Sequence, residues 1–365
     1  MPDCNANSGA RRVLLTGATG LVGGYLLDRL CHRPDLDVHV LVRPRPGQSV
    51  RGRLRVLGAY FGDPDRFAHV GAHEGDVSLP GLGLGASSTK LLTEGITDVI
   101  HAAASISFED SDRNHRTNEK GVRHVLASIP RSARFFHVST AYVGGLASQF
   151  LETELDVGQS FRNDYERSKF QVERFVREWY ADTPERLTVV RPSIVIGEQD
   201  NGRTFQFFTL YKVLRMMVAF SRRHPGEPFA LAYDPDATQN YIPVDRLSEM
   251  FGEIFSDPGF HGHTYHLVDE NPIKNRDFGV LLEEQLGCRI VNRAPDESSR
   301  ALNRVSVEST AGYLAYLHGE PRFDCSARNQ LGSARSPIRF DRRYLEALLD
   351  FCEQTAWGKR LAISR

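Results

Sequence analysis

Short apolar runs alternate with longer amphipathic stretches through the first half of the chain. The apolar runs predict strands over residues 12–16, 38–42, 68–74, 97–102, 134–139 and 187–191. Apolar spacings of three and four predict helices over residues 21–30, 54–61, 118–128 and 165–180. Strands that alternate with helices are typical of right-handed βαβ crossovers. We therefore expect a doubly wound α/β fold with a parallel sheet over residues 12–197.

The alternation ends after Pro192. Helices are predicted over residues 204–222, 276–286 and 343–355, and a strand over residues 264–268. We expect residues 198–365 to form mainly a smaller C-terminal cap, with some segments returning to the sheet. The polar residues 1–11 predict a flexible N-terminal tail, and the Gly-rich residues 79–88 a surface loop.

Composition excludes several classes of protein. The 365 residues are 41% hydrophobic and 25% charged, which is ordinary for a globular protein, and the net charge of −1 gives no reason to expect a nucleic-acid partner. No apolar run is long enough for a membrane span, and no signal peptide is evident. The five cysteines show no C-x-x-C spacing and the thirteen histidines no ligand spacing, so we expect reduced thiols, no metal and a cytoplasmic location.

The first strand leads directly into a glycine-rich turn. The turn reads Thr16-Gly17-Ala18-Thr19-Gly20-Leu21-Val22-Gly23, and a helix is predicted to begin inside it. Gly17 would permit the tight turn, Gly20 the approach of a pyrophosphate, and Gly23 close packing of helix on strand. The first N–H groups of the helix would then face the anion. This context predicts a dinucleotide-binding domain over residues 12–197.

The end of the second predicted strand indicates which dinucleotide. NAD enzymes usually place a carboxylate there, whereas this chain has Arg43, followed by Pro44 and Arg45. A guanidinium group would hold a 2′-phosphate, so NADP(H) is favoured over NAD(H). Arg53 is a second candidate for this contact.

Tyr165 and Lys169 lie four positions apart in a predicted helix. This spacing places both side chains on the same face. A positive charge near a phenol lowers its pKa, so the pair is a candidate proton donor. The spacing alone is also common on exposed helices, and only the rest of the chain gives it weight.

In residues 12–290 the chain resembles the extended short-chain dehydrogenase/reductase superfamily, most closely its thioester reductase and fatty acyl reductase branch. The resemblance rests on the glycine turn and on the following segments in their shared order: Gly75-Asp76-Val77, His101 to Ala104, Asn118, Val138 to Gly144, Tyr165-x-x-x-Lys169, Arg191 to Gly197, Tyr241 to Asp245, and Tyr265 to Leu267. It implies a Rossmann-type fold whose C-terminal cap binds substrate.

The resemblance also implies roles for individual residues. The catalytic residues would be Thr140, Tyr165 and Lys169, with Thr140 rather than Ser139 facing the substrate, because neighbours at a strand end point to opposite faces. Lys169 would also bind the nicotinamide ribose. The remaining cofactor-binding residues would be Gly17, Thr19, Gly20, Leu21, Val22, Gly23, Arg43, Arg53, Asp76, Val77, Ala102, Ala103, Pro192 and Ile194.

The sequence thus predicts an NADPH-dependent reductase that transfers hydride to a carbonyl of a small, apolar or aromatic metabolite. An acyl thioester, an aldehyde and a ketone all stay open as substrates, free or linked to a carrier or coenzyme A, and a homodimer is possible. Two alternatives share the fold: a sugar-nucleotide epimerase or dehydratase that holds NAD, and a non-catalytic nucleotide sensor. Arg43 speaks against the first, and the retained Tyr165 and Lys169 against the second.

One segment of the cap has two interpretations. Residues 205–211 together with Met216 and Met217 are unusually rich in aromatic and apolar side chains. They form either the core of the cap or the wall of an apolar substrate pocket. The nearby Arg215, Arg222 and Arg223 are either a solvated helix face or a contact for a coenzyme phosphate.

Overall fold

The computed structural model describes residues 11–108, 110–294 and 312–364. The tail expected over residues 1–11 therefore lies outside the described residues, except for Arg11, which begins the first strand. The described chain forms two compact units that interleave along the sequence. The first unit contains residues up to 139, 168–190 and 251–264, and the second contains residues 140–167, 191–250 and 265–365. The division expected at residue 197 stays a prediction.

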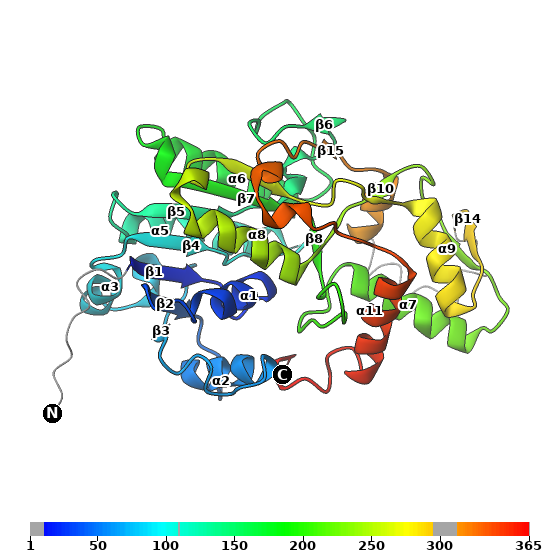
Figure 1. The fold of residues 1–365 in the computed structure, drawn as a ribbon, viewed down its shortest axis with the longest axis horizontal. Helices are drawn as coiled ribbons and strands as arrows, with labels where there is room; N and C mark the ends of the chain where they lie inside the picture. The colour runs from blue at the N-terminus through cyan, green and yellow to red at the C-terminus, as the bar shows by residue number, and fades with distance from the viewer. Residues whose placement is uncertain (1–10, 109, 295–311, 365) are drawn as a thin grey trace. The chain divides into compact units, whose positions relative to one another are not determined.

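A seven-stranded sheet organises the first unit, in the order β12-β7-β5-β4-β1-β2-β3 (Figure 1). The pairings from β3 through to β7 are all parallel. The chain order along the sheet reverses at β1, as in doubly wound folds, where the ligand binds outside the carboxyl ends of the strands. The strands are β1 (Arg11–Thr16), β2 (Leu36–Val42), β3 (Gly71–Glu74), β4 (Asp98–His101), β5 (Arg134–Val138), β7 (Leu187–Pro192) and β12 (Thr264–Leu267).

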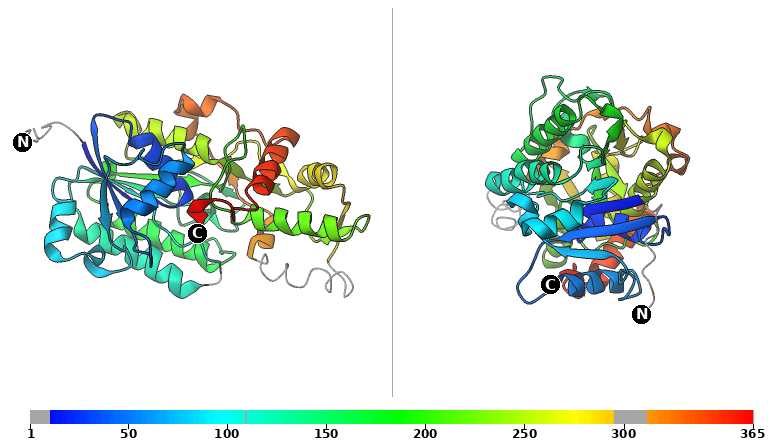
Figure 2. Two further views of the ribbon diagram at one scale, coloured as in Figure 1. Left: turned by 90° about the horizontal axis from the view of Figure 1, so that it is seen from below. Right: turned by 90° about the vertical axis from the view of Figure 1, so that its left-hand side faces the viewer.

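Helices cover both faces of this sheet. The views in Figure 2 show α1 (Leu21–Leu30) and α2 (Val50–Tyr60) on one face, with α3 (Ala86–Thr93) and α5 (Gly121–Ser128) on the other. The second of these faces buries one apolar cluster. In it, Leu14, Val99 and Phe135, which lie side by side on β1, β4 and β5, pack with side chains of α3, α5 and α6 (Asp164–Trp179). This burial on both faces explains why the strands read as nearly continuous apolar runs.

The second unit consists of short strands and longer helices. Its pairings are β8 with β11, β9 with β14, β10 with β13 and β6 with β15. The bounds are β6 (Gln149–Phe150), β8 (Ile194–Ile196), β9 (Phe229–Leu231), β10 (Thr238–Gln239), β11 (Tyr241–Pro243), β13 (Ile273–Lys274), β14 (Ile290–Asn292), β15 (Arg322–Phe323), α7 (Leu210–Arg223), α9 (Asn275–Leu286) and α11 (Arg342–Gln354). Helix α8 (Val244–Ser256) runs from this unit into the first.

Several elements differ from the sequence prediction. The Gly-rich loop expected over residues 79–88 is a short 3-10 turn followed by the first residues of α3. The helix expected from residue 118 begins earlier, with α4 (Ser111–Asn114) and a π-helical turn, η2 (His115–Lys120). The helix expected from residue 204 begins only at Leu210, after Thr209 with a φ of +43°.

Candidate active site

The glycine turn between β1 and α1 has the geometry that the spacing predicted. Gly17 has a φ of +75°, and a Cβ on it would lie 2.6 Å from the backbone carbonyl of Ala102 at the end of β4. A Cβ on Gly23 would lie 2.2 Å from the carbonyl oxygen of Gly17. Gly20 precedes α1 and offers no side-chain cap. The first N–H groups of α1 are thus directed at a backbone-lined turn that fits a pyrophosphate.

Guanidinium groups gather beside this turn. Arg43 and Arg45 are exposed directly after β2, and Arg53 on α2 lies behind them. Arg53 donates to Thr19 Oγ1 at 2.8 Å and to the carbonyl oxygen of Arg43 at 2.5 Å. Burial, together with the charges of Arg45 and Arg43, lowers the pKa of Arg53 to about 10. Three cations this close favour an anion, and a phosphate matches the geometry of guanidinium donors.

The other predicted nucleotide residues of this unit follow the ends of the next strands. Asp76 and Val77 come after β3, where Asp76 accepts from the N–H of Ser78 at 2.8 Å. Ala102 and Ala103 come after β4 and are partly exposed. Leu21 and Val22 are the first two residues of α1. These side chains therefore follow three strands whose carboxyl ends lie at one edge of the parallel sheet.

Thr140 and Tyr165 meet within the second unit. Thr140 caps the 3-10 turn η3 (Ala141–Gly144), and its hydroxyl donates to the carbonyl oxygen of Pro192 at 3.3 Å. A hydrogen bond between the side chains of Thr140 and Tyr165 lowers the pKa of the phenol. Ser139 instead donates to Glu173 at 2.7 Å, within the first unit. The structure thus brings Thr140, and not Ser139, to Tyr165.

The pKa of Tyr165 shifts in the direction opposite to the one expected. Burial raises it to about 12, against the lowering by Thr140, and the charge of Glu166 raises it further. The predicted lowering by Lys169 was wrong, because loss of solvation outweighs the favourable interactions of the phenolate. Tyr165 therefore keeps its proton at neutral pH.

Lys169 follows Tyr165 by one turn of α6 and is buried. Its Nζ donates to the carbonyl oxygen of Val138 at 2.7 Å, at the end of β5. Burial lowers the pKa of Lys169 to about 8, while the charge of Glu173 raises it. The ammonium form therefore predominates at neutral pH.

Pro192 and Ile194, the last predicted cofactor residues, lie in the second unit. Pro192 ends β7 and accepts the Thr140 hydroxyl, and Ile194 begins β8 opposite Tyr241. Neither has a side chain that could donate a hydrogen bond, so any contact with a cofactor would be apolar or through the backbone.

The aromatic run before α7 is only partly buried. Phe205, Tyr211, Met216 and Met217 belong to the core of the second unit, whereas 44% of Phe208 is exposed. Arg215, Arg222 and Arg223 are exposed on α7, and Arg222 pairs with a glutamate of α11. Core packing therefore accounts for most of the run.

The buried histidines of the sheet are neutral packing residues. His101 and His137 stack with ring centroids 5.9 Å apart, and Thr16 Oγ1 lies 2.9 Å from His101 Nδ1. Burial, followed by the charge of Lys169, lowers the pKa of His101 to about 3 and lowers that of His137. Neither ring takes up a proton at neutral pH.

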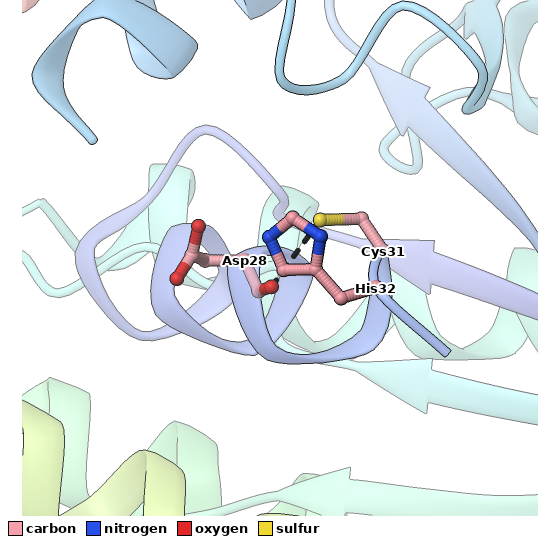
Figure 3. A group of neighbouring side chains, drawn as sticks. All are labelled: Asp28, Cys31 and His32. Carbon is pink, nitrogen blue, oxygen red and sulfur yellow. Dashed lines mark hydrogen bonds between the residues drawn. The ribbon is translucent and has the colours of Figure 1, made fainter. Parts of the chain in front are cut away.

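Figure 3 shows Asp28, Cys31 and His32 at the end of α1, whose ligand-type atoms lie within 4.8 Å of one another. The carboxylate of Asp28 is paired with Arg66, and burial raises the pKa of the Cys31 thiol to about 12. A protonated thiol and a carboxylate held by arginine are poor ligands. The group gives no argument for a metal centre.

Among the described residues, no helix is long and apolar enough to cross a membrane.

A family model described as "Male sterility protein" matches residues 15–251, which is more than half of the chain. The chain belongs to this family of extended short-chain dehydrogenase/reductase proteins with an NAD(P)-binding fold. This family comprises NAD(P)-dependent reductase domains of the extended short-chain dehydrogenase/reductase type.

Curated relatives are much longer multidomain proteins. The chain is 29% identical to the nonribosomal peptide synthetase asaC of Aspergillus flavus over 73% of its own length and 27% of the relative's. It is also 29% identical to an isonitrile lipopeptide synthase of Streptomyces coeruleorubidus, over 65% of its own length and 16% of the relative's. The chain thus spans about a quarter or less of the relatives it matches.

Solved structures share the fold. The terminal R domain of the myxalamid PKS-NRPS pathway superposes with a TM-score of 0.79 at 23% identity, covering 96% of this chain and 92% of that one. A UDP-glucuronic acid 4-epimerase from Bacillus cereus in complex with NAD gives 0.64 at 16% identity, covering 94% and 99%. At these identities the likeness establishes the doubly wound fold, which reductases and epimerases share.

Several residues around the site were not found from the sequence. Arg45 could have been proposed as a phosphate contact from the sequence, because it stands two positions after Arg43. Glu173, which accepts from Ser139, lies one turn beyond Lys169 on the same helix. Glu320, which bonds to Tyr142, lies 178 positions away from it and carries no local signal.

Proposed function

We propose that this chain uses NADPH to reduce the carbonyl carbon of a carrier-linked acyl thioester, with Tyr165 as the proton donor. The observation that carries the proposal is the hydrogen bond between Thr140 and Tyr165, with Lys169 one turn further along α6. The names of the longer relatives, which are peptide and polyketide synthases, favour a thioester over a free aldehyde or ketone.

When bound, NADPH supplies the hydride that adds to the carbonyl carbon. As charge develops on the carbonyl oxygen, the Tyr165 phenol donates its proton to that oxygen. The Thr140 hydroxyl, which donates to the Pro192 carbonyl oxygen in the structure, rotates to donate a hydrogen bond to the substrate oxygen and so stabilises the charge. The carbon–sulfur bond then breaks, so that one thioester, one NADPH and one proton yield an aldehyde, a thiol and NADP⁺.

Lys169 acts through its charge. It is held by the Val138 carbonyl oxygen and has its pKa near 8, so it presents an ammonium group at neutral pH. An ammonium one turn from Tyr165 stabilises the phenolate formed after proton transfer. The same group is suited to hold ribose hydroxyls, because it has three donors.

The preference for NADPH rests on the cluster of Arg43, Arg45 and Arg53. A 2′-phosphate beside these guanidinium groups would relieve their mutual repulsion, which contributes to the lowered pKa of Arg53. NAD(H) lacks that phosphate and leaves the three charges uncompensated.

The thiol side of the substrate would be a phosphopantetheine arm on a carrier protein, or coenzyme A, which carries the same arm. A carrier-linked substrate would explain why similar sequences occur inside synthases. A cytoplasmic location, a homodimer and a cap that begins after residue 197 belong to the same proposal.

The experiment is an assay of NADPH oxidation with acyl-coenzyme A thioesters and acylated carrier protein, with product identification. We expect an aldehyde and a free thiol, and their loss in Tyr165→Phe with NADPH affinity retained. An epimerase would instead purify with bound NAD and consume none. If NADPH is oxidised with ketones or free aldehydes but not with thioesters, the proposed thioester substrate is wrong and the proposed reductase activity stands.

A further inference from the structure

The carboxyl group of Glu320 is hydrogen-bonded to the turn that begins at Thr140. Glu320 Oε2 accepts from the Tyr142 hydroxyl at 2.9 Å and from the N–H of Asn240 at 3.2 Å. Its other oxygen, Oε1, accepts from Thr238 Oγ1 at 2.9 Å. Tyr142 in turn lies in η3, and its N–H donates to Thr140 Oγ1 at 3.4 Å. One side chain therefore links the strand β10 and its following residue to the Thr140 turn.

The same network reaches the helix turn of Tyr165. The Tyr142 ring packs edge-on against Tyr316, with centroids 4.9 Å apart. Tyr316 hydrogen-bonds with Glu166, the residue directly after Tyr165, and accepts from Asn163 Nδ2 at 3.0 Å. Thr140 and Tyr165, the two side chains proposed to contact the substrate oxygen, are thus both supported by one buried set of aromatic and acidic side chains.

The charged and titratable groups that face Glu320 come from four directions. Arg162, which precedes α6, pairs with Glu166 at 3.2 Å and donates to the carbonyl oxygen of Gly319 at 2.6 Å. Tyr142 comes from η3, Tyr241 from β11, and Tyr313 from the segment before η6 (Ala315–His318). Burial raises the pKa of Glu320 to about 7, against the lowering by its three hydrogen bonds and by Arg162.

We infer that Glu320 is a positioning residue for the reduction, which in its ionised form holds Thr140 and Tyr165 in their hydrogen-bonded arrangement through Tyr142. This rests on the proposed function, whose proton donor it supports. The ionised carboxylate only accepts hydrogen bonds and matches three donors, one of which, the Asn240 N–H, cannot reverse. Protonation removes the charge that strengthens these bonds and loosens the turn.

The sign of the pH effect follows from the ionised form being the active one. Turnover rises with pH through about 7 as Glu320 loses its proton. Lys169 gives the opposite limb, because its ammonium is lost as the pH rises past about 8. Glu320 therefore accounts for the acid side of the pH–rate profile, and Lys169 for the alkaline side.

The activity test compares three variants over pH 5.5 to 9, a range chosen to bracket both groups. Glu320→Ala should lower kcat about tenfold with the KM for NADPH unchanged, because all three hydrogen bonds to the carboxylate are lost, including the one from Tyr142 of the turn. Glu320→Gln keeps the contacts to Tyr142, Asn240 and Thr238 but has no charge, like the protonated acid. It should therefore hold a rate between those of wild type and Glu320→Ala and lack the acid limb. Glu346→Gln, on the exposed face of α11, is the matched control and should behave as wild type.

A second measurement does not depend on turnover. Amide hydrogen exchange of residues 140–145 should be about tenfold faster in Glu320→Ala than in wild type, because the turn loses its anchor, and Glu320→Gln should lie between the two. Unchanged exchange and an unchanged acid limb in Glu320→Gln would overturn the inference. If the turn loosens as expected but no thioester is reduced, Glu320 anchors the turn while the proposed reaction fails.

Discussion

The Tyr165 phenol is poised to give up a proton rather than to accept one. Burial raises its pKa to about 12, so the donor form is fully populated at neutral pH. Thr140 acts on the same group through a hydrogen bond, and Lys169 lies one turn further along α6. A donor that is protonated at rest and stabilised after transfer suits the reductive direction.

Replacement of Tyr165 by Phe removes the proton donor and little else. We expect kcat to fall about 10²–10⁴-fold, the range for a well-placed general acid. The dissociation constant for NADPH should change little, because the glycine turn and the arginine cluster belong to the first unit. Steady-state kinetics and fluorescence titration of NADPH measure the two quantities. Full turnover in this variant would rule out Tyr165 as the donor.

Thr140 and Ser139 offer a matched pair of adjacent hydroxyls. Thr140→Val should lower kcat about 10²–10³-fold, as removal of an oxyanion donor does. Ser139→Ala removes a bond to Glu173 on the other side of the strand end and should leave kcat within a few-fold of wild type. Equal losses in both variants would show that stability, and not the carbonyl contact, accounts for the effect.

At this scale, local spacing was informative and distant contacts were not. The four-residue spacing of Tyr165 and Lys169 is visible in the sequence because a helix turn is local. The direction of the Tyr165 pKa shift could not be predicted from the sequence, because it depends on burial by the rest of the unit. Glu320 was invisible because its partners are brought to it only by the fold.

Among the elements, the arginines beside the glycine turn carry the proposed preference for NADPH. Arg43→Glu reverses the charge where a 2′-phosphate would bind. We expect the KM for NADPH to rise about ten- to hundredfold, the size of a lost charge-assisted contact, with little change for NADH. Arg55→Ala removes another arginine of α2, one that pairs with Asp65, and serves as the control. An unchanged ratio of the two cofactors would contradict the NADPH preference.

The opposite end of β4 carries a buried ion cluster. Asp98 is fully buried and accepts from Arg11 at 3.0 and 3.1 Å and from Arg134 at 2.7 and 3.0 Å. Asp98→Ala should lower the free energy of unfolding by about 3 kcal/mol, since it leaves two arginines without their counter-charge. Urea unfolding measures this, and Asp182→Asn at an exposed site is the control. A loss below 1 kcal/mol would show that water replaces the pairing.

Asp98 also sets the response to acid. Burial raises its pKa, but the hydrogen bonds from Arg11 and Arg134 outweigh burial and lower it overall. A lowered folded-state pKa means that the stabilisation is present above the ordinary value of about 4 and is lost as the pH falls through the folded value. In Asp98→Asn, the stability should therefore depend less on pH below about 4 than in wild type.

Most strands could be predicted from the sequence because both faces of the sheet are buried, which makes each strand a short apolar run. Helix α3 was missed because its start, Gly85-Ala86-Ser87-Ser88, reads as a loop. Helix α8 was also missed, although Val244, Leu247, Met250 and Ile254 show a helical spacing.

For the whole molecule, the family could be recognised from the sequence, whereas the structure of the second unit could not be predicted from it. The first unit follows the regular βαβ pattern, whereas the second is assembled from segments 140–167, 191–250 and 265–365. Short strands in this unit pair over long separations, such as β6 with β15. Contacts of that kind leave no periodic signal, so the substrate side of the site could not be derived from the sequence.

The central claim is that the chain cleaves an acyl thioester by reduction with NADPH. The most direct measurement follows NADPH oxidation and thiol release together, with an acyl-coenzyme A or an acylated carrier protein as substrate. We expect one thiol to be released for every NADPH consumed until aldehyde accumulates, and neither signal with Tyr165→Phe. Tightly bound NAD with no consumption of NADPH in the presence of any thioester would contradict it.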